Sequence, residues 1–113
     1  MPHFIIEHAK AFIGTEDIES ALNITLECGA ASGFINREDI KVRAIPYEDF
    51  LFGDGKTNFI HVTVRLLAGR TDSQKESLSI SLRDSLAGRF PDVQSISIDV
   101  QDMNPASYKK RLL

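Results

Sequence analysis

Apolar and polar residues alternate in four segments of the chain, and this period of two predicts four β-strands. We expect these strands over residues 2–7, 40–45, 59–67 and 93–100. The third strand has the most regular apolar face, formed by Ile60, Val62, Val64 and Leu66. The second strand places two cations, Lys41 and Arg43, on the face opposite its apolar residues. Pro46 is expected to limit the extension of this second strand.

Between the strands, apolar residues recur every three or four positions, which predicts two helices. Thr15 is expected to be the N-cap of the first helix, and Gly33 lies where its C-cap is expected. The second helix is expected to follow Thr71, because a glutamine three residues later completes a capping box. Gly88 and Pro91 end this helix. Its buried face is expected to carry a four-residue repeat: Leu78, Leu82, Leu86 and Phe90.

The predicted order is strand–helix–strand, repeated once. Each unit suggests a right-handed crossover between two parallel strands. The two helices would cover one face of a four-stranded sheet and leave the other face bare. Because large apolar faces usually mark interfaces, we expect a closed homo-oligomer whose sheets pack inward. Residues 47–58 are expected to form a loop or hairpin, in which Phe50 and Phe52 can be core residues or the wall of a pocket.

The composition fits one globular domain over residues 1–113, with 42% hydrophobic and 26% charged residues. A formal net charge of −3 argues against nonspecific nucleic-acid binding, which depends on clustered Lys and Arg. The chain has one cysteine, Cys28, and so no intramolecular disulfide. Neither a signal-peptide pattern nor an apolar run of about 20 residues is present. We therefore expect a cytoplasmic protein without membrane contact.

Pro2 carries the most distinctive candidate chemistry in the chain. A small residue after the initiator methionine normally allows Met1 to be removed, which would leave a secondary amine at the N-terminus. Burial or nearby positive charge lowers the pKa of such an amine, so it could act as a general base near neutral pH. Two alternatives remain open: Pro2 is simply tolerated as the first residue of a strand, or Met1 is retained and the Pro2 nitrogen is a non-basic amide.

Arg70 lies between the end of a predicted strand and the start of a predicted helix. The unpaired N–H groups and positive dipole of a helix start favour an anion, and a guanidinium beside them can hold a carboxylate in bidentate fashion. Lys41 and Arg43 add two cations, although an edge strand protected against aggregation carries the same residues. Clustered near Pro2, the three cations would suit a dianionic substrate in an otherwise acidic chain.

Other kinds of site have weaker support in the sequence. His3, His8 and His61 do not have the spacing of zinc ligands, and no metal site is expected. Of the three, His61 is the strongest candidate for a functional role, because alternation places it on the face opposite Ile60 and Val62. There is no glycine-rich phosphate loop, and no serine or cysteine lies in a nucleophile motif.

Two stretches resemble the 5-carboxymethyl-2-hydroxymuconate Δ-isomerases of the tautomerase superfamily, which includes macrophage migration inhibitory factor. The opening residues 1–7 are similar almost residue for residue, and residues 59–70 are similar along their length. Asp54-Gly55 and the segment 104–109 agree more loosely. The resemblance implies an α+β fold of duplicated β-α-β units, with a four-stranded mixed sheet, two helices on one face, and assembly as a homotrimer.

The resemblance also implies a function: a cofactor-independent isomerase of aromatic catabolism that acts on a small anionic carboxylate substrate. Pro2 would be the catalytic base and acid, and Arg70 would bind a substrate carboxylate. The family's second arginine aligns with Lys41, and Arg43 on the same strand face could serve instead.

The substitution at Lys41 leaves other activities open. These are arylpyruvate keto–enol tautomerisation, decarboxylation or dehalogenation of a small acid, and a non-catalytic binding role on the same scaffold. A retained Met1 would favour the binding role.

Overall fold

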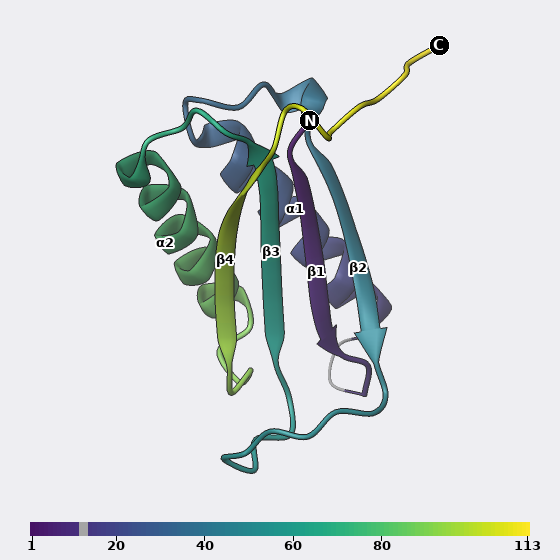
Figure 1. Ribbon diagram of the computed structural model, residues 1–113. Helices are drawn as coiled ribbons and strands as arrows, with labels where there is room; N and C mark the ends of the chain where they lie inside the picture. Colours follow the sequence, from purple (N-terminus) through teal and green to yellow (C-terminus); the bar gives the residue numbers. More distant parts are fainter. Residues whose placement is uncertain (12–13) are drawn as a thin grey trace.

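The computed structural model describes residues 1–11 and 14–113 and has the expected order of two β-α-β units (Figure 1). The first unit comprises β1 (His3–Ala9), α1 (Thr15–Ala31), a short 3₁₀ turn η1 (Arg37–Asp39) and β2 (Lys41–Tyr47). The second comprises β3 (Ile60–Leu67), α2 (Asp72–Arg89) and β4 (Ile96–Met103). Neither helix is long and apolar enough to cross a bilayer, as judged over the described residues.

The four strands form one mixed sheet in the order β2-β1-β3-β4. Within each unit the two strands are parallel, and the units join through the antiparallel pair β1 and β3. In register, His3 on β1 lies between Lys41 on β2 and Arg65 on β3. The N-terminus of the chain therefore lies beside the start of β2 and the end of β3.

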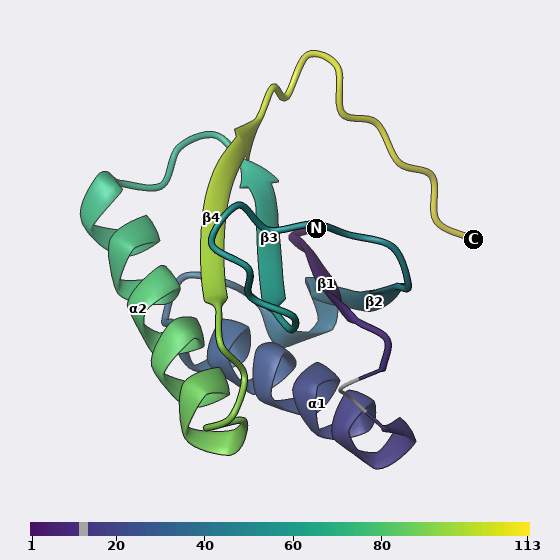
Figure 2. The same ribbon diagram turned by 90° about the horizontal axis from the view of Figure 1, so that it is seen from below.

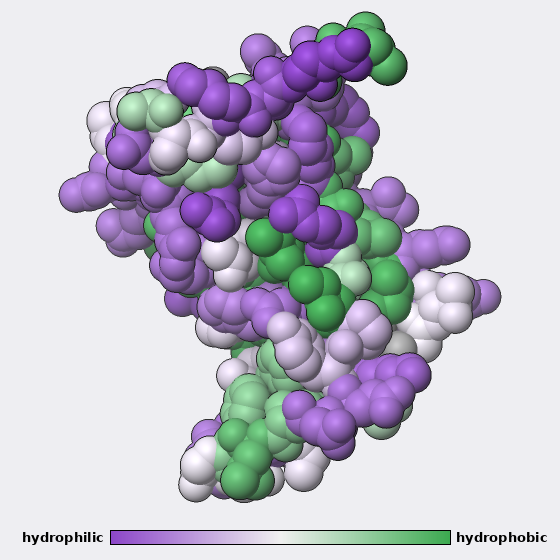
Figure 3. Space-filling model, turned by 45° about the vertical axis from the view of Figure 1, so that its right-hand side comes forward, coloured by the Kyte–Doolittle hydropathy of each residue, from purple (hydrophilic) through white to green (hydrophobic). Residues whose placement is uncertain are grey.

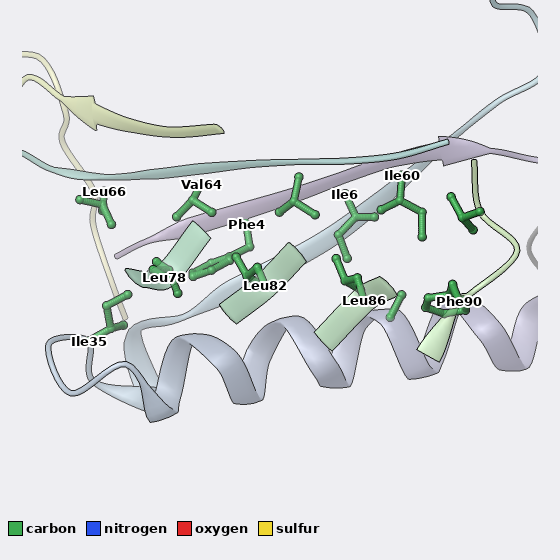
Figure 4. Close-up of a cluster of buried hydrophobic side chains, with 13 residues drawn as sticks. Phe4, Ile6, Ile35, Ile60, Val64, Leu66, Leu78, Leu82, Leu86 and Phe90 are labelled. Carbon is green, nitrogen blue, oxygen red and sulfur yellow. The ribbon is translucent and has the colours of Figure 1, made fainter. Parts of the chain in front are cut away.

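Both helices pack on the same face of the sheet and bury the core against it (Figure 2, Figure 4). The core takes Phe4 and Ile6 from β1, alternate residues of β3, and the predicted leucine repeat of α2. Phe4 and Ile6 are fully buried, as are Leu82 and Leu86. Gly29 of α1 packs closely here, since a Cβ atom at this position would lie 3.0 Å from the Phe4 ring. The predicted fold class and buried faces are thus confirmed.

The helix starts agree with the sequence prediction to within one residue. Thr71 is the N-cap of α2 as predicted: its side chain accepts from the Gln74 backbone N–H, and the Gln74 side chain accepts from the Thr71 N–H. At α1 the prediction was one residue late, because Gly14 is the N-cap and Thr15 begins the helix. Gly33 lies just beyond the C-cap of α1 with a positive φ of 89°, a conformation that favours glycine.

The boundaries of three strands, β1, β2 and β4, differ clearly from the prediction. Pairing with β2 carries β1 on to Ala9. Pro46 lies inside β2 and does not end it, because β2 is an edge strand and a proline facing outward loses no ladder hydrogen bond. The last strand begins later than expected, at Ile96, because the Val93 N–H donates to Phe90 in the turn after α2. It continues to Met103, which pairs with Leu67 at the end of β3.

The uncovered face of the sheet is mixed, so the expectation of a bare apolar surface holds only in part: Ile5, Ile45 and Met103 lie on it beside many polar residues. The polar side chains alternate with the buried ones and include His3, Glu7, Lys41, Arg43, His61, Thr63, Arg65, Asp99 and Gln101. Seen toward the β2 edge, the surface has an apolar patch bordered by polar side chains, and more apolar side chains on the protruding β2–β3 loop (Figure 3). Apolar area alone therefore does not argue for an oligomer through this face.

The core makes a first prediction about stability. Leu82 is fully buried under the sheet, so Leu82→Ala should lower the free energy of unfolding by about 2–5 kcal/mol. Ile80 on the same helix is 40% exposed, and Ile80→Ala should cost about 1 kcal/mol or less. Urea unfolding of both variants at one protein concentration measures the difference. Equal losses would contradict this packing.

Candidate active site

Pro2 is buried at the point where β1 begins. The backbone N–H of Lys41 donates to the Pro2 carbonyl over 3.0 Å, so the start of β2 fixes the position of the proline. On its other side, β1 pairs with β3, whose end leads toward Arg70. Two neighbouring strands thus bring residues 2, 41 and 70 to the same end of the sheet (Figure 1).

Pro2 and Arg70 line the same hollow, which has a volume of about 150 Å³. The end of β3 forms one wall, and the segment between α1 and η1 forms another. The lining residues are Met1, Pro2, Phe34, Ile35, Asn36, Asp39, Leu66, Leu67 and Arg70. Six of these nine residues are apolar in type, and Arg70 is the one cation among them.

Arg70 is held by backbone oxygens from two elements. Its Nη1 donates to the Leu67 carbonyl over 3.2 Å, and its Nη2 donates to the Phe34 carbonyl over 3.4 Å. Among the described residues it has no ion-pair partner. The guanidinium is therefore positioned without being neutralised, and its remaining N–H groups can bind a carboxylate.

Lys41 and the N-terminal amine share one acceptor, the carbonyl oxygen of Asp39. The Lys41 Nζ donates to the Asp39 carbonyl oxygen over 3.1 Å, and the Met1 amine donates to the same oxygen. Partial burial, then the hydrogen bond and positive charge of Lys41, lower the pKa of the Met1 amine from 8.0 to about 6. Lys110 in the C-terminal tail lowers this pKa further, and Asp39 opposes the shift. The Met1 amine is therefore deprotonated more readily than an ordinary α-amino group.

Arg43 lies in a different hollow, on the uncovered face of the sheet. Its Nη1 donates to His3 Nδ1 over 3.0 Å, and Tyr108 closes the far side of His3. The structure thus brings Pro2, Arg70 and Lys41 to one region and directs the Arg43 side chain away from the hollow that contains Pro2.

The remaining sequence candidates lie at the opposite end of the sheet. His61 is paired in register with Glu7 and bonds to Ser97 Oγ over 2.6 Å. Phe50 and Phe52 pack edge-on or tilted against Phe59, with ring centroids 4.9 and 5.3 Å from it. They line a hollow of about 660 Å³, which does not contain Pro2. No group of three potential metal ligands occurs within residues 1–11 and 14–113.

Sequence reasoning missed two contributors to this region. Phe34 and Asp39 supply backbone oxygens that position Arg70 and the two amines. Side-chain patterns cannot reveal a role played by a backbone carbonyl. The parallel pairing of β1 and β2 was the available signal, because it requires the connection after α1 to return to the N-terminal end of the sheet.

Comparison with solved structures identifies the fold. A crystal structure of 5-carboxymethyl-2-hydroxymuconate delta-isomerase has a TM-score of 0.76 and 12% identity, covering 99% of this chain and 88% of that one. A macrophage migration inhibitory factor-like protein from Entamoeba histolytica has a TM-score of 0.80 and 13% identity, covering 97% and 95%. The Q0 fused 4-OT wild-type symmetric trimer has a TM-score of 0.82 and 14% identity, covering 96% and 90%.

Sequence comparison identifies the family. No curated protein matches the chain. The family model described as 5-carboxymethyl-2-hydroxymuconate isomerase matches residues 2–111, nearly the whole chain, beginning at the proline that lines the hollow. The chain therefore belongs to the 5-carboxymethyl-2-hydroxymuconate isomerase family and has the tautomerase fold.

Proposed function

We propose that this protein isomerises 5-carboxymethyl-2-hydroxymuconate and that Pro2, freed of Met1, moves the proton. The observation that carries the proposal is the shared hollow of Pro2 and Arg70, with Lys41 bonded to Asp39 on its lining. Family membership supports an isomerase, and the substrate matches the family description. The arrangement offers a base and one cation in a small hollow, with Lys41 next to it through its bond to Asp39.

The proposed reaction is a proton transfer through a dienolate. The neutral Pro2 amine takes the proton of the 2-hydroxyl group, and the electron pair moves along the conjugated system. The protonated amine then returns a proton to a carbon of that system, giving the ketone and regenerating the neutral base. The proton taken from the hydroxyl group is balanced by the proton returned to carbon, so we propose that no cofactor takes part.

Arg70 and Lys41 have distinct parts in this proposal. The fixed guanidinium of Arg70 binds a substrate carboxylate with its free N–H groups. Lys41, which after burial lowers the pKa of the Met1 amine, would lower the pKa of the freed Pro2 amine in the same way, and it would stabilise the negative charge that develops on the dienolate. Arg43 is held by His3 on the uncovered face, so we assign it no contact with this substrate.

We also propose that the protein is a cytoplasmic homotrimer whose uncovered sheet faces lie inward. The support is the likeness to the fused 4-OT symmetric trimer and the single cysteine of the chain. The polar side chains of the uncovered face imply that hydrogen bonds and charges contribute to such an interface. Analytical ultracentrifugation should give three times the chain mass of 12.6 kDa, and a monomer would contradict the assembly.

The first experiment follows the ultraviolet absorbance of 5-carboxymethyl-2-hydroxymuconate with two forms of the protein. One has Met1 removed, verified by intact mass, and the other retains it. The Met1-free form should accelerate the conversion strongly, and the Met1-retaining form should be inactive, because its Pro2 nitrogen is an amide. No acceleration by the Met1-free form would exclude this substrate, and equal activity of both forms would exclude Pro2 as the base.

Arg70 is expected to contribute to binding and to transition-state stabilisation. Arg70→Ala removes the group proposed to hold a carboxylate and should lower kcat/KM by about 100-fold. The matched control is Arg83→Ala, which removes an exposed arginine paired with Asp84 on α2. Steady-state kinetics should show the control within about twofold of the parent. A similar effect of both substitutions would remove Arg70 from the site.

Lys41 is expected to set the pH range of the enzyme. Removing its charge in Lys41→Gln should raise the pKa of the N-terminal amine, since a neighbouring cation disfavours the protonated form. A smaller fraction of the amine is then neutral at a given pH, so the acid limb of kcat/KM should move to higher pH. Full pH profiles of Lys41→Gln and Arg83→Gln test this. An unmoved limb would show that Lys41 does not tune the base.

A further inference from the structure

The positive charges of this acidic chain are divided unevenly. Of its 13 Lys and Arg residues, six form ion pairs with described residues. The other seven lie where β2 begins, along and after the end of β3, and in the C-terminal tail. These are Lys41, Arg43, Arg65, Arg70, Lys109, Lys110 and Arg111. The cations that form no ion pair with described residues therefore gather at one end of the molecule, although the net charge is −3.

A second hollow opens at this end, on the uncovered face of the sheet. Its volume is about 200 Å³, and it shares no lining residue with the hollow that contains Pro2. The lining residues come from all four strands and from the C-terminal tail. They are His3, Ile5, Arg43, Arg65, Met103 and Tyr108. Two of the seven unpaired cations thus face one small cavity.

The hydrogen bonds of this cavity leave donors directed into it. A guanidinium can only donate, so the 3.0 Å contact from Arg43 Nη1 makes His3 Nδ1 an acceptor. The proton of neutral His3 is then on Nε2, which donates to the Tyr108 hydroxyl oxygen over 2.9 Å. The Tyr108 O–H and the other N–H groups of Arg43 remain available.

Arg65 adds further hydrogen-bond donors to the cavity. Its side chain has no ion pair and no hydrogen bond to any residue in the described ranges, and it lies opposite His3 in register. The nearest carboxylates along β4 are engaged elsewhere: Asp99 accepts from Gln101 and Asp102 pairs with Lys75. The cavity therefore has two guanidinium groups without an ion pair to described residues and a hydroxyl, and no carboxylate is among its lining residues.

The titration of His3 supports the same conclusion. Its pKa is lowered by burial first, and then by the charges of Arg43, Lys41, the N-terminal amine and Arg65. These groups reach His3 from β2, the chain start and β3, while Tyr108 is the tail residue that contacts it. A protonated His3 would add a further positive charge to the cluster.

We propose that this cavity is a second anion site, which binds a small multivalent oxyanion, either a phosphate or a polycarboxylate, between Arg43, Arg65 and the Tyr108 hydroxyl. Guanidinium groups bind both kinds of oxyanion in bidentate fashion. The site is separate from the proposed substrate site, and its test needs no turnover. In the trimer proposed above, a bound anion would also reduce repulsion between the arginines of the three inward faces.

The experiment titrates the full chain with inorganic phosphate, and separately with citrate, at constant ionic strength. Binding is followed through the His3 ring resonances in ¹H–¹⁵N NMR spectra. A saturable shift is expected, together with a rise in the pKa of His3, because a nearby anion favours the protonated ring. Whichever of the two anions saturates identifies the class of ligand. A linear response to both anions would overturn the proposal.

Three variants locate the site. Arg65→Gln should weaken binding at least tenfold, and Tyr108→Phe should weaken it less, because it removes only the hydroxyl. Arg83→Gln, on the outer face of α2, should bind as the parent does. Arg65→Lys keeps the charge and serves if Arg65→Gln does not fold, and it should retain part of the affinity. Unchanged binding in Arg65→Gln and Tyr108→Phe would place the anion elsewhere and overturn the proposal.

Discussion

The pairing of β1 on both of its edges is the constraint on which the rest of the structure depends. Parallel pairing with β2 and antiparallel pairing with β3 fix His3 between Lys41 and Arg65. The same register directs Phe4 and Ile6 into the core under the two helices. A slip of one residue would turn both side chains onto the uncovered face. Burial of these apolar residues therefore holds the N-terminus in place, and with it Pro2.

The position of the N-terminus determines which charges surround it. The ends that meet here carry cations without paired acids, so an amine at the chain start is surrounded by positive charge. Several acidic residues pair with Lys and Arg elsewhere in the chain, among them Asp17, Glu48 and Asp54. The protein thus combines an overall acidic charge with one end suited to anions. The two hollows at that end use different cations, Arg70 in one and Arg43 with Arg65 in the other.

The sequence predicted the fold well where patterns were strong. The period of two in β3 and the leucine repeat of α2 correspond directly to the core, and Thr71 caps α2 as expected. It was less reliable at boundaries set by pairing partners. Pro46 was taken as a stop because its place at the sheet edge depends on strand order, which local sequence does not encode.

The site was predictable only in part. Pro2 and Arg70 were predicted because their residue types suit the chemistry and their neighbours resemble a family, and the structure places both on one hollow. Lys41 and Arg43 could not be separated from sequence, since both lie on one strand face and only the contacts of His3 and Asp39 distinguish them. Tyr108 was not expected at all, because a tail residue reaches β1 across 105 positions of sequence.

The most direct test of this account is a titration of the Pro2 nitrogen in Met1-free protein labelled with ¹⁵N-proline. The account predicts a pKa clearly below the ordinary α-amino value of about 8, so that the amine is largely neutral near pH 7. Its chemical shift should therefore change in the neutral or mildly acidic range. An amine that stays protonated beyond about pH 8 would contradict the claim that the cation-rich end of the sheet prepares Pro2 as a base.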